Sequence, residues 1–470
     1  MYITTTIAYV NARPHLGYAL ELVQADVLAR HHRRRGEPVR FQTGTDDNSL
    51  KSVLAAEAEG VPVRELVDRN AAAFEGLRET LDLSFDSFVR TSAQPRHRAG
   101  VERIWQAVGH DLYRRHYEGL YCVGCEQFYP QGPCPDGHAA PLQHVSEENW
   151  FFRLSTYQDA LSDLIRSGRL RIEPAARRNE VLAFVEAGLE DISVSRSAAR
   201  ARGWGIPVPG DPSQVVYVWW DALANYITAL EGGDYDRWWV DEPRKVHVMG
   251  KGVIRFHAVY WPAMLLSAGE PLPTEIFVHD YVTAGGRKIS KSAGGGADPV
   301  ALVDAYGVDA VRWWLLREVP RVGDVDFTEE RLVARADEDL ANGLGNLVNR
   351  VATMVHRFLD GHVPPAGERL VEVRVDEALD AFDFRRAAGE VWRIVEEANR
   401  YVERTRPWKQ SRAGQEASLG TLVAACRELA VHLEPFLPTA AARVAAAVGG
   451  ERLPRPEPLF GRLAPAGAHG

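Results

Sequence analysis

The sequence contains no apolar run of the roughly 20 residues that a bilayer-spanning helix needs. Its first residues, Met1 to Thr6, do not form a basic segment followed by an apolar one, so no secretory signal is visible. Only four cysteines occur among 470 residues, too few for a disulfide scaffold. We therefore expect no membrane span and a soluble, cytosolic protein.

Lysine is also scarce, because only six of the 55 basic residues are lysines. In a chain where arginine serves as the general cation, the remaining lysines are candidates for tasks that need a compact ammonium group, although chance is the alternative for any one of them. The net charge is -9. This acidic balance argues against non-specific coating of nucleic acid, while a local basic face can still hold one defined nucleic acid.

The composition, with 46% hydrophobic and 25% charged residues, is that of an ordinary globular protein. Residues 2–7, 17–35 and 39–44 have the strand, helix and strand patterns of a βαβ unit. Further strands are predicted at residues 215–220, 246–250 and 276–279. The fold class expected is α/β, with a doubly wound, Rossmann-like parallel sheet split by an insertion.

From residue 298 onward the sequence predicts mostly helix, with 3.6-residue periodicity at residues 334–358, 378–404 and 420–433. Asp298-Pro299 and Thr328-Glu329-Glu330 are typical helix starts. The tail, residues 453–470, is rich in Pro, Gly and Ala and is expected to be loose. The predicted division is residues 1–113 and 210–292 as two halves of a nucleotide-binding domain, 114–209 as an insertion, 293–330 as a linking fold and 331–470 as a helical domain.

Two motifs suggest phosphate chemistry. Pro14-His15-Leu16-Gly17-Tyr18 stands where the first strand turns into its helix, and a helix N-terminus there can bind an anion, although a plain helix start is the alternative. The loop from Gly286 to Gly296 holds Lys288 and Lys291 among small residues. Such a cationic loop can fold over a triphosphate, whereas the alternative is a solvated surface loop.

These two motifs resemble the two signatures of class I aminoacyl-tRNA synthetases. More specific stretches resemble methionyl-tRNA synthetases: Tyr9-Val10-Asn11-Ala12, residues 42–46, 191–196, 204–211, 216–222, 256–264, 339–342 and 345–350. The similarity runs in register from Tyr2 to about Pro438. It implies ATP-dependent activation of L-methionine to methionyl-adenylate, transfer to tRNA(Met), and Mg²⁺ with ATP.

The resemblance also implies roles for individual residues. ATP would be handled by His15, Gly17, Tyr18, Lys288 and Lys291, with Arg196 and Lys251 as assisting catalytic cations. Methionine would be bound by Ile7, Tyr9, Asp46, Trp219, Ala222, Leu223, Tyr226, Phe256, His257 and Trp261, where Asp46 holds the ammonium group and the others form an apolar pocket suited to a thioether. Taken singly, each aromatic residue is better explained by core packing, and only together do they indicate a pocket.

Cys122, Cys125, Cys134 and His138 resemble the zinc knuckle of the family, and three thiolates with one imidazole can close a tetrahedral structural zinc site. Cys426, in an apolar helical stretch, is expected in the core. Asn346, Arg350 and Trp408 match positions that the family uses on the anticodon, where arginine and asparagine contact base edges and tryptophan stacks. Hydrophobic capping is the alternative for Trp408. The helical domain would thus bind the anticodon, and we expect a monomer.

Three departures from the family pattern lie in the catalytic half. Tyr18 replaces a histidine, Asp47-Asn48-Ser49 replaces an acidic or small residue followed by His-Gly, and Gly252 replaces an aspartate. Two hypotheses follow. The chain is a working methionine–tRNA ligase with a divergent site, or it is a paralogue that activates another amino acid, uses a non-tRNA acceptor, or only binds ligand. Pyrophosphate exchange with the standard amino acids would separate them.

Overall fold

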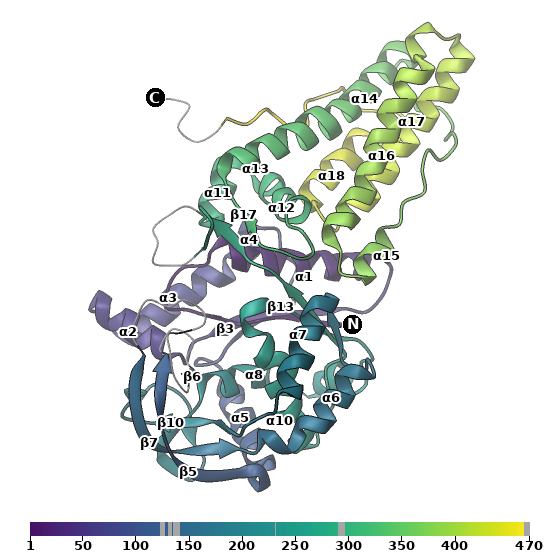
Figure 1. Ribbon diagram of the computed structural model, residues 1–470. Coiled ribbons are helices and arrows are strands. Elements are labelled where there is room, and N and C mark those ends of the chain that lie inside the picture. The colour runs from purple at the N-terminus through teal and green to yellow at the C-terminus, as the bar shows by residue number, and fades with distance from the viewer. Residues whose placement is uncertain (123–126, 130–133, 135–141, 231, 290–296, 465–470) are drawn as a thin grey trace. The chain divides into compact units, whose positions relative to one another are not determined.

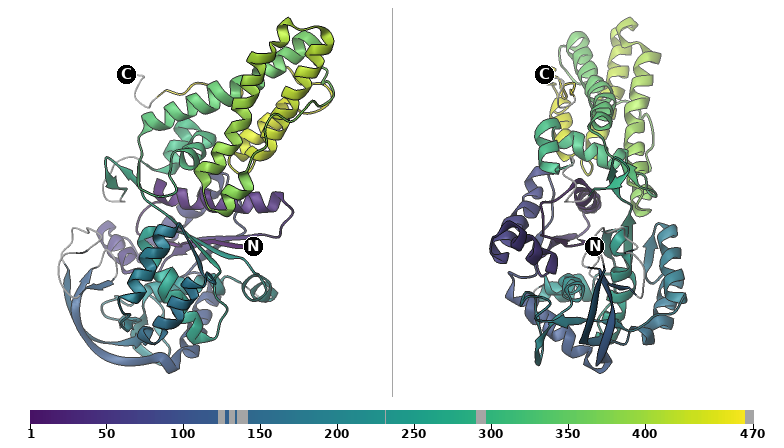
Figure 2. Two further views of the ribbon diagram at one scale, coloured as in Figure 1. Left: turned by 45° about the vertical axis from the view of Figure 1, so that its right-hand side comes forward. Right: turned by 60° about the vertical axis from the view of Figure 1, so that its left-hand side comes forward.

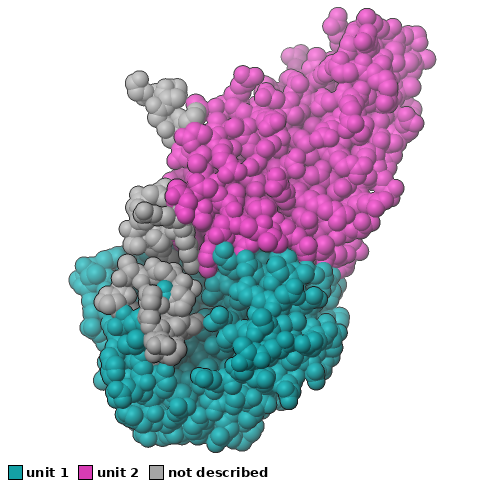
Figure 3. Space-filling model, in the orientation of Figure 1, with its two compact units in different colours: residues 1–14, 38–76, 85–279 teal, residues 15–37, 77–84, 280–470 magenta. Residues whose placement is uncertain are grey.

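The computed structural model describes residues 1–122, 127–129, 134, 142–230, 232–289 and 297–464 (Figure 1). The chain forms two compact units, which Figure 3 colours separately. Unit 1 comprises Met1–Pro14, Pro38–Gly76 and Phe85–His279. Unit 2 comprises His15–Glu37, Leu77–Ser84 and Asp280–Gly470. The first signature motif is therefore divided from the first strand, because His15 begins a segment of unit 2.

The centre of unit 1 is a seven-stranded sheet in the order β2-β3-β1-β13-β14-β8, with β4 also paired to β3. Its strands are β1 (Tyr2–Thr5), β2 (Ala8–Tyr9), β3 (Arg40–Asp46), β4 (Ser87–Arg90), β8 (Arg171–Glu173), β13 (Lys245–Gly250) and β14 (Glu275–His279). All the pairings are parallel. This confirms the predicted α/β class with a Rossmann-like parallel sheet.

The insertion predicted at residues 114–209, called the connecting region below, carries a second sheet. In this sheet β5 (Leu112–Cys122) and β7 (Gln143–Phe152) form a long antiparallel pair. Strands β6 (Gln127–Tyr129) and β9 (Ile192–Ser193) flank this pair. A three-stranded sheet follows, made of β10 (Ser195–Ser197), β11 (Pro207–Val208) and β12 (Asp211–Val216). One strand of the main sheet, β8, also comes from this region and pairs with β14.

The prediction of a strand over residues 215–220 is wrong in its second half. Strand β12 ends at Val216, and helix α8 (Val218–Thr228) begins two residues later. Tyr217 is the extended N-cap residue between them. Short apolar runs do not distinguish a buried strand from a buried helix by periodicity, and here the run contains the end of one and the first turn of the other. Trp219 and Trp220 thus lie on a helix.

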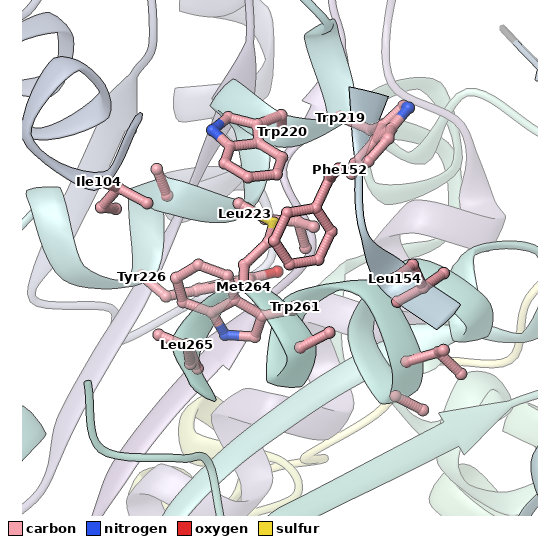
Figure 4. Packing of buried hydrophobic residues seen from close by; sticks show 14 of the residues in the cluster. Ile104, Phe152, Leu154, Trp219, Trp220, Leu223, Tyr226, Trp261, Met264 and Leu265 are labelled. Carbon is pink, nitrogen blue, oxygen red and sulfur yellow. The ribbon is translucent and has the colours of Figure 1, made fainter. Parts of the chain in front are cut away.

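The other elements of unit 1 are helical. They are α2 (Leu50–Glu59), α3 (Val63–Glu75), α5 (Pro95–Ala107), η1 (Gly109–Asp111), η2 (Leu154–Tyr157), α6 (Gln158–Arg166), α7 (Ala175–Glu186), α9 (Gly233–Tyr235), η3 (Asp236–Val240), η4 (Lys251–Val253), η5 (Phe256–Tyr260) and α10 (Trp261–Ala268). Figure 4 shows the core of this unit, where the rings of Phe152, Trp220, Tyr226 and Trp261 surround Met264. All five side chains are at most 1% exposed.

Unit 2 is mainly helical. Its elements are α1 (Leu16–Arg34), α4 (Leu77–Thr80), α11 (Pro299–Tyr306), α12 (Val308–Arg317), α13 (Glu329–Arg335), η6 (Ala336–Gly345), α14 (Asn346–Leu359), α15 (Val375–Asp380), α16 (Phe384–Thr405), η7 (Pro407–Lys409), α17 (Arg412–Leu433) and α18 (Pro438–Ala447). A small sheet joins β15 (Val282–Ala284), β16 (Arg287–Lys288) and β17 (Val325–Asp326). Helices α14, α16 and α17 run side by side in both views of Figure 2.

The predicted helix starts at Asp298 and Thr328 are confirmed, because each side chain accepts a hydrogen bond from its helix's first turn. The single helix predicted over residues 378–404 is wrong. It is interrupted between α15 and α16, where Phe382 has a φ of 52° and Asp383 caps the new helix. Helix α17 begins eight residues before the predicted Gly420. Among the described residues no helix is both long enough and apolar enough to cross a bilayer.

The tail is better held than its composition predicts, at least as far as residue 464. Leu453 is 3% exposed, and its N–H donates to the carbonyl of Gly361. Ten residues later the N–H of Leu463 donates to Asp337 Oδ1 at 2.9 Å. Backbone hydrogen bonds to partners far away in sequence hold these residues, and composition does not reveal such partners. Residues 465–470 lie outside the described part of the chain.

Candidate active site

A cavity of about 200 Å³ opens at the carboxyl ends of the central parallel strands of unit 1. This edge of the sheet is where open α/β folds bind ligands. The wall consists of the segment after β1, the last residue of β3, the first turns of α8, and the η4–η5 turn. Its lining residues are Thr6, Ile7, Ala8, Tyr9, Asp46, Trp219, Ala222, Leu223, Tyr226, Val253, Phe256 and His257.

The structure thus brings together nine of the ten residues predicted for methionine. The tenth, Trp261, does not line the cavity and packs on Tyr226, with ring centroids 6.0 Å apart. Thr6, Ala8 and Val253 were missed by sequence reasoning. Thr6 and Ala8 flank Ile7, and Val253 lies one helical turn before His257, so adjacency to predicted residues was the available signal.

Two polar side chains of the wall satisfy each other. His257 Nδ1 lies 2.9 Å from the Val253 carbonyl, which can only accept a hydrogen bond, so Nδ1 carries the proton. His257 Nε2, 2.7 Å from the Tyr226 hydroxyl, then accepts from it. The wall they share is therefore suited to an apolar group rather than to one that needs strong hydrogen bonds.

Asp46 is the one carboxylate among the described residues that line the cavity. It is the last residue of β3 and only 2% exposed. A carboxylate that faces an otherwise apolar cavity can form a charge-assisted hydrogen bond with a cationic group of a ligand. The arrangement fits a molecule with an ammonium group and an apolar side chain.

The neighbouring Asp47 faces a different set of partners. Its carboxylate accepts from Arg90 at 3.1 Å and from the hydroxyl groups of Ser92 and Thr45 at 2.8 Å. Burial raises the pKa of the Asp47 carboxyl above its ordinary value, and the charge of Arg90 opposes that shift. Asp47, the first of the three residues that depart from the family pattern after Asp46, therefore stabilises the end of β3 and does not line the cavity.

A second cavity, of about 690 Å³, shares Trp219 and Phe256 with the first. Trp219 lies in a cluster of rings, 5.7 Å from Phe256 and 5.1 Å from Tyr260 between centroids. The second cavity also bears charges of both signs, from Arg115, Arg255, Glu190 and Asp191. Because these rings form a wall between the two spaces, their positions set the size of the smaller one.

The predicted assisting cations occupy two short segments of unit 1. Arg196, in β10, is 2% exposed and its guanidinium lies 4.5 Å from the centroid of the Tyr217 ring. Lys251 begins the η4 turn, directly after β13. Gly252, which replaces the family's aspartate, is exposed in the same turn. Lys51 also lies near the first cavity, with its ammonium group 4.7 Å from the Tyr9 ring, and sequence reasoning gave it no role.

The first signature forms the start of α1 in unit 2. His15 is the N-cap residue, and its Nδ1 accepts a hydrogen bond from the Tyr18 N–H at 3.3 Å. Because Nδ1 accepts, a neutral His15 ring carries its proton on Nε2, which keeps it a donor. A methyl group at Gly17 would lie 3.2 Å from the His15 ring, which is closer than an ordinary van der Waals contact. Glycine at this position therefore lets the ring keep its orientation.

The second signature is only partly described. Lys288 ends β16, which pairs with β15 in unit 2. Lys291 lies outside the described residues, as do Ser290 and Ser292. The predicted roles of both lysines therefore stay predictions.

Two of the four predicted zinc ligands are described. Cys122 and Cys134 are buried, 1% and 7% exposed. Cys125 and His138 lie outside the described residues, and no metal-binding group is found among the residues that the structure describes. Cysteine thiolates and a histidine imidazole are the donors that zinc prefers, so the two described cysteines fit a zinc site in their donor chemistry, while the geometry of the set stays a prediction. Cys426 lies in the core, as expected, and burial raises the pKa of its thiol to about 12.

The predicted anticodon residues lie together on the helices of unit 2. Asn346 is exposed at the start of α14, and Arg350 follows one turn later. The Arg350 guanidinium lies 5.5 Å from the Trp408 ring centroid and 2.7 Å from Glu403 Oε1. Trp408 is 41% exposed, so a large part of its ring is available for stacking.

Comparisons with known proteins agree with this arrangement. The model of the family described as tRNA synthetases class I (M) matches residues 1–143 and 139–352. The model described as the anticodon binding domain of methionyl tRNA ligase matches residues 368–464. The methionine–tRNA ligase of Brucella suis is 40% identical over 98% of this chain and 97% of its own. The Mycobacterium tuberculosis enzyme is 40% identical over 99% of this chain and 98% of its own.

Solved structures are similar over the whole length as well. The crystal structure of Mycobacterium tuberculosis methionyl-tRNA synthetase bound by methionyl-adenylate has a TM-score of 0.90 at 38% identity, over 98% of this chain and 99% of that one. Its free form has a TM-score of 0.83 at 36% identity, over 99% of this chain and 98% of that one.

Proposed function

The chain belongs to the methionyl-tRNA synthetase family and is a methionine–tRNA ligase, and from this premise we propose how its residues divide the work. The enzyme activates methionine with ATP as methionyl-adenylate and transfers the methionyl group to tRNA. The observation that carries the assignment to this site is the cavity of unit 1, where Asp46 is the one carboxylate among the described lining residues and most of the wall is apolar.

In the first step, a carboxylate oxygen of methionine attacks the α-phosphate of Mg²⁺·ATP, and pyrophosphate leaves. Asp46 binds the methionine ammonium group, while the rings of Trp219 and Phe256 enclose the thioether. Negative charge develops on the α-phosphate, where His15, Lys288 and Lys291 stabilise it by hydrogen bonds and charge, assisted by Arg196 and Lys251. Gly17 and Tyr18 complete the ATP site.

In the second step, a hydroxyl of the terminal adenosine of tRNA(Met) attacks the carbonyl of the adenylate, and AMP leaves. Catalysis in both steps consists of positioning and charge stabilisation, and no covalent enzyme intermediate is required. We also propose residues 331–470 as the anticodon-binding domain, a monomeric state and a cytoplasmic location. Residues 1–113 and 210–292 form the nucleotide-binding domain in this proposal, 114–209 the insertion and 293–330 the linking fold.

The test is ATP–pyrophosphate exchange with each of the 20 standard amino acids, with and without tRNA. Exchange is expected with methionine and without tRNA, because the first step involves only methionine and ATP. A protein that exchanges with another amino acid instead would be the paralogue considered above. The anticodon domain would then still bind tRNA, so a separate filter-binding measurement with tRNA(Met) distinguishes a changed substrate from a changed partner.

The zinc site is structural in this proposal, because four protein ligands leave no open position for a substrate. Cys122, Cys125, Cys134 and His138 would hold the ion, which cross-links the connecting region and takes no part in either step. Cys125→Ser is expected to lower both the zinc content and the midpoint of thermal unfolding, measured by elemental analysis and circular dichroism. The control Cys426→Ala should keep its zinc, and a wild type without zinc near one per chain would contradict the site.

Trp408 is expected to stack on a base of the anticodon. Trp408→Ala should weaken aminoacylation of tRNA(Met) by about 1–3 kcal/mol in kcat/KM, the usual value of one base–ring stack. Methionine-dependent pyrophosphate exchange needs no tRNA and should not change. Trp408→Phe, which keeps a ring, should restore most of the loss. If exchange falls together with aminoacylation, the ring supports the fold rather than the tRNA.

A further inference from the structure

Asn48 connects two buried carboxylates. Its backbone N–H lies 3.3 Å from Asp46 Oδ1, and its side-chain Nδ2 donates to Asp221 Oδ2 at 2.8 Å. The three residues are 9%, 2% and 0% exposed, for Asn48, Asp46 and Asp221 in that order. One residue therefore binds both the carboxylate that faces the cavity and a second one on α8.

The other carboxylate oxygen of Asp221, Oδ1, is hydrogen-bonded to a residue of another helix. His97, in α5, lies with Nε2 at 3.0 Å from Asp221 Oδ1 and with Nδ1 at 2.6 Å from the Thr228 hydroxyl. A carboxylate accepts but does not donate, so Nε2 carries the proton, and a neutral ring accepts at Nδ1 from Thr228. His97 and Asp221 are both fully buried.

This chain of hydrogen bonds depends on the close approach of α5 and α8. A Cβ at Gly100 would lie 2.3 Å from Thr228 Cγ2, so the packing admits no side chain there. Asn48 itself is held at the start of α2, where Ser49 is the N-cap residue and accepts from the Lys51 N–H at 3.0 Å. Helices α5 and α8 and the turn after β3 thus fix Asn48 on both sides.

We propose that Asn48 and Asp221 are positioning residues, which hold the Asp46 carboxylate in the orientation that receives the ammonium group of the amino-acid substrate. The proposal deepens the proposed function and rests on Asp46 as the ammonium ligand. A carboxylate that is oriented before binding loses less freedom when the substrate arrives, and binds it more tightly. It also explains the departure at this position: the asparagine amide is a neutral donor, and a histidine, as in the family pattern, can donate in the same place.

The experiment compares two ligands in Asn48→Ala, which keeps the backbone N–H but removes the amide. Methionine should bind about tenfold more weakly, because the lost bond to Asp221, of about that size, no longer holds the Asn48 N–H against Asp46. The second ligand is 4-(methylthio)butanoate, which is methionine without its amino group. As a competitive inhibitor of exchange it should keep its inhibition constant, because it makes no contact with an ammonium ligand. KM for ATP should also stay within about twofold.

Three further variants separate this role from a merely structural one. Ser52→Ala, in the first turn of α2, removes a buried hydroxyl that bonds to neither carboxylate and should bind methionine like the wild type. Asn48→His should recover most of the methionine affinity, and it also serves if Asn48→Ala does not fold. In an Asp46→Ala background, Asn48→Ala should cause no further loss of methionine affinity.

Equal losses for methionine and for the amine-free analogue would overturn the proposal, because Asn48 would then support the whole cavity rather than Asp46. An additional loss in the Asp46→Ala background would overturn it as well. Unchanged methionine affinity in Asp46→Ala alone would instead remove the assignment of Asp46, on which the inference rests. Methionine-dependent exchange by the wild type is read separately, so failure of the proposed function is recognised by itself.

Discussion

Asp46→Ala is expected to lower kcat/KM for methionine in pyrophosphate exchange by roughly 30-fold to 5,000-fold, the equivalent of about 2–5 kcal/mol. The reason is that Asp46 is the one carboxylate among the described lining residues, and it is 2% exposed. Its removal would leave the substrate ammonium group enclosed without a counter-charge. Most of the loss should appear in KM for methionine, with KM for ATP nearly unchanged.

The neighbouring Asp47→Asn is the matched control for this experiment. The Asp47 carboxylate is bound by Arg90 and Ser92 and does not line the cavity. Asp47→Asn should therefore lower the midpoint of thermal unfolding, whereas it should lower kcat/KM for methionine much less than Asp46→Ala does. Steady-state exchange kinetics at saturating ATP give kcat/KM for methionine, and thermal unfolding followed by circular dichroism gives the midpoint. If Asp47→Asn lowers kcat/KM for methionine more than Asp46→Ala does, the wrong carboxylate has been assigned to the ammonium group.

The second large effect concerns stability. Arg312→Met is expected to destabilise unit 2 by about 3–5 kcal/mol, as for other buried ion pairs that lose one partner. Arg312 is fully buried, and its guanidinium donates to Asp26 Oδ2 at 2.9 Å and to the Phe436 carbonyl at 2.8 Å. It also donates to the carbonyl of Leu81 at 2.8 Å. Methionine fills the space but leaves the two buried carbonyl groups without this donor, and Asp26 loses one of its two arginine partners, since Arg30 also donates to its Oδ2 at 2.9 Å.

Urea unfolding followed by circular dichroism measures the change, and hydrogen exchange of the amides in α1 and α12 assigns it to unit 2. The control is Arg400→Met, since Arg400 is 62% exposed and lies 3.4 Å from Glu396, which is 53% exposed, and a surface pair of this kind contributes at most about 1 kcal/mol. An unfolding midpoint for Arg312→Met equal to that of the control would contradict the role of this network.

The sequence predicted the elements that local patterns determine. The strands at residues 246–250 and 276–279 agree closely with β13 and β14, and the helix from Gly17 to Arg35 agrees with α1. Thr328 and Asp298 were recognised as helix starts because N-capping uses a side chain and backbone atoms only two or three residues away. Local patterns failed at Trp219 and Trp220, where an apolar run hides a change from strand to helix.

The residues predicted to bind methionine were identified from the resemblance to the family, because Ile7, Asp46 and Trp219 stand far apart in the sequence and spacing alone could not have joined them.

What no local pattern contains is the partner of a buried polar group. Asn48 and Asp221 are 173 residues apart, and Arg312 and Asp26 are 286 apart. The sequence by itself determined the family, the parallel α/β fold and most of the cavity wall. Only the tertiary structure decided which donor reaches which carboxylate, because burial makes each such pair obligatory while the packing of helices and strands selects it.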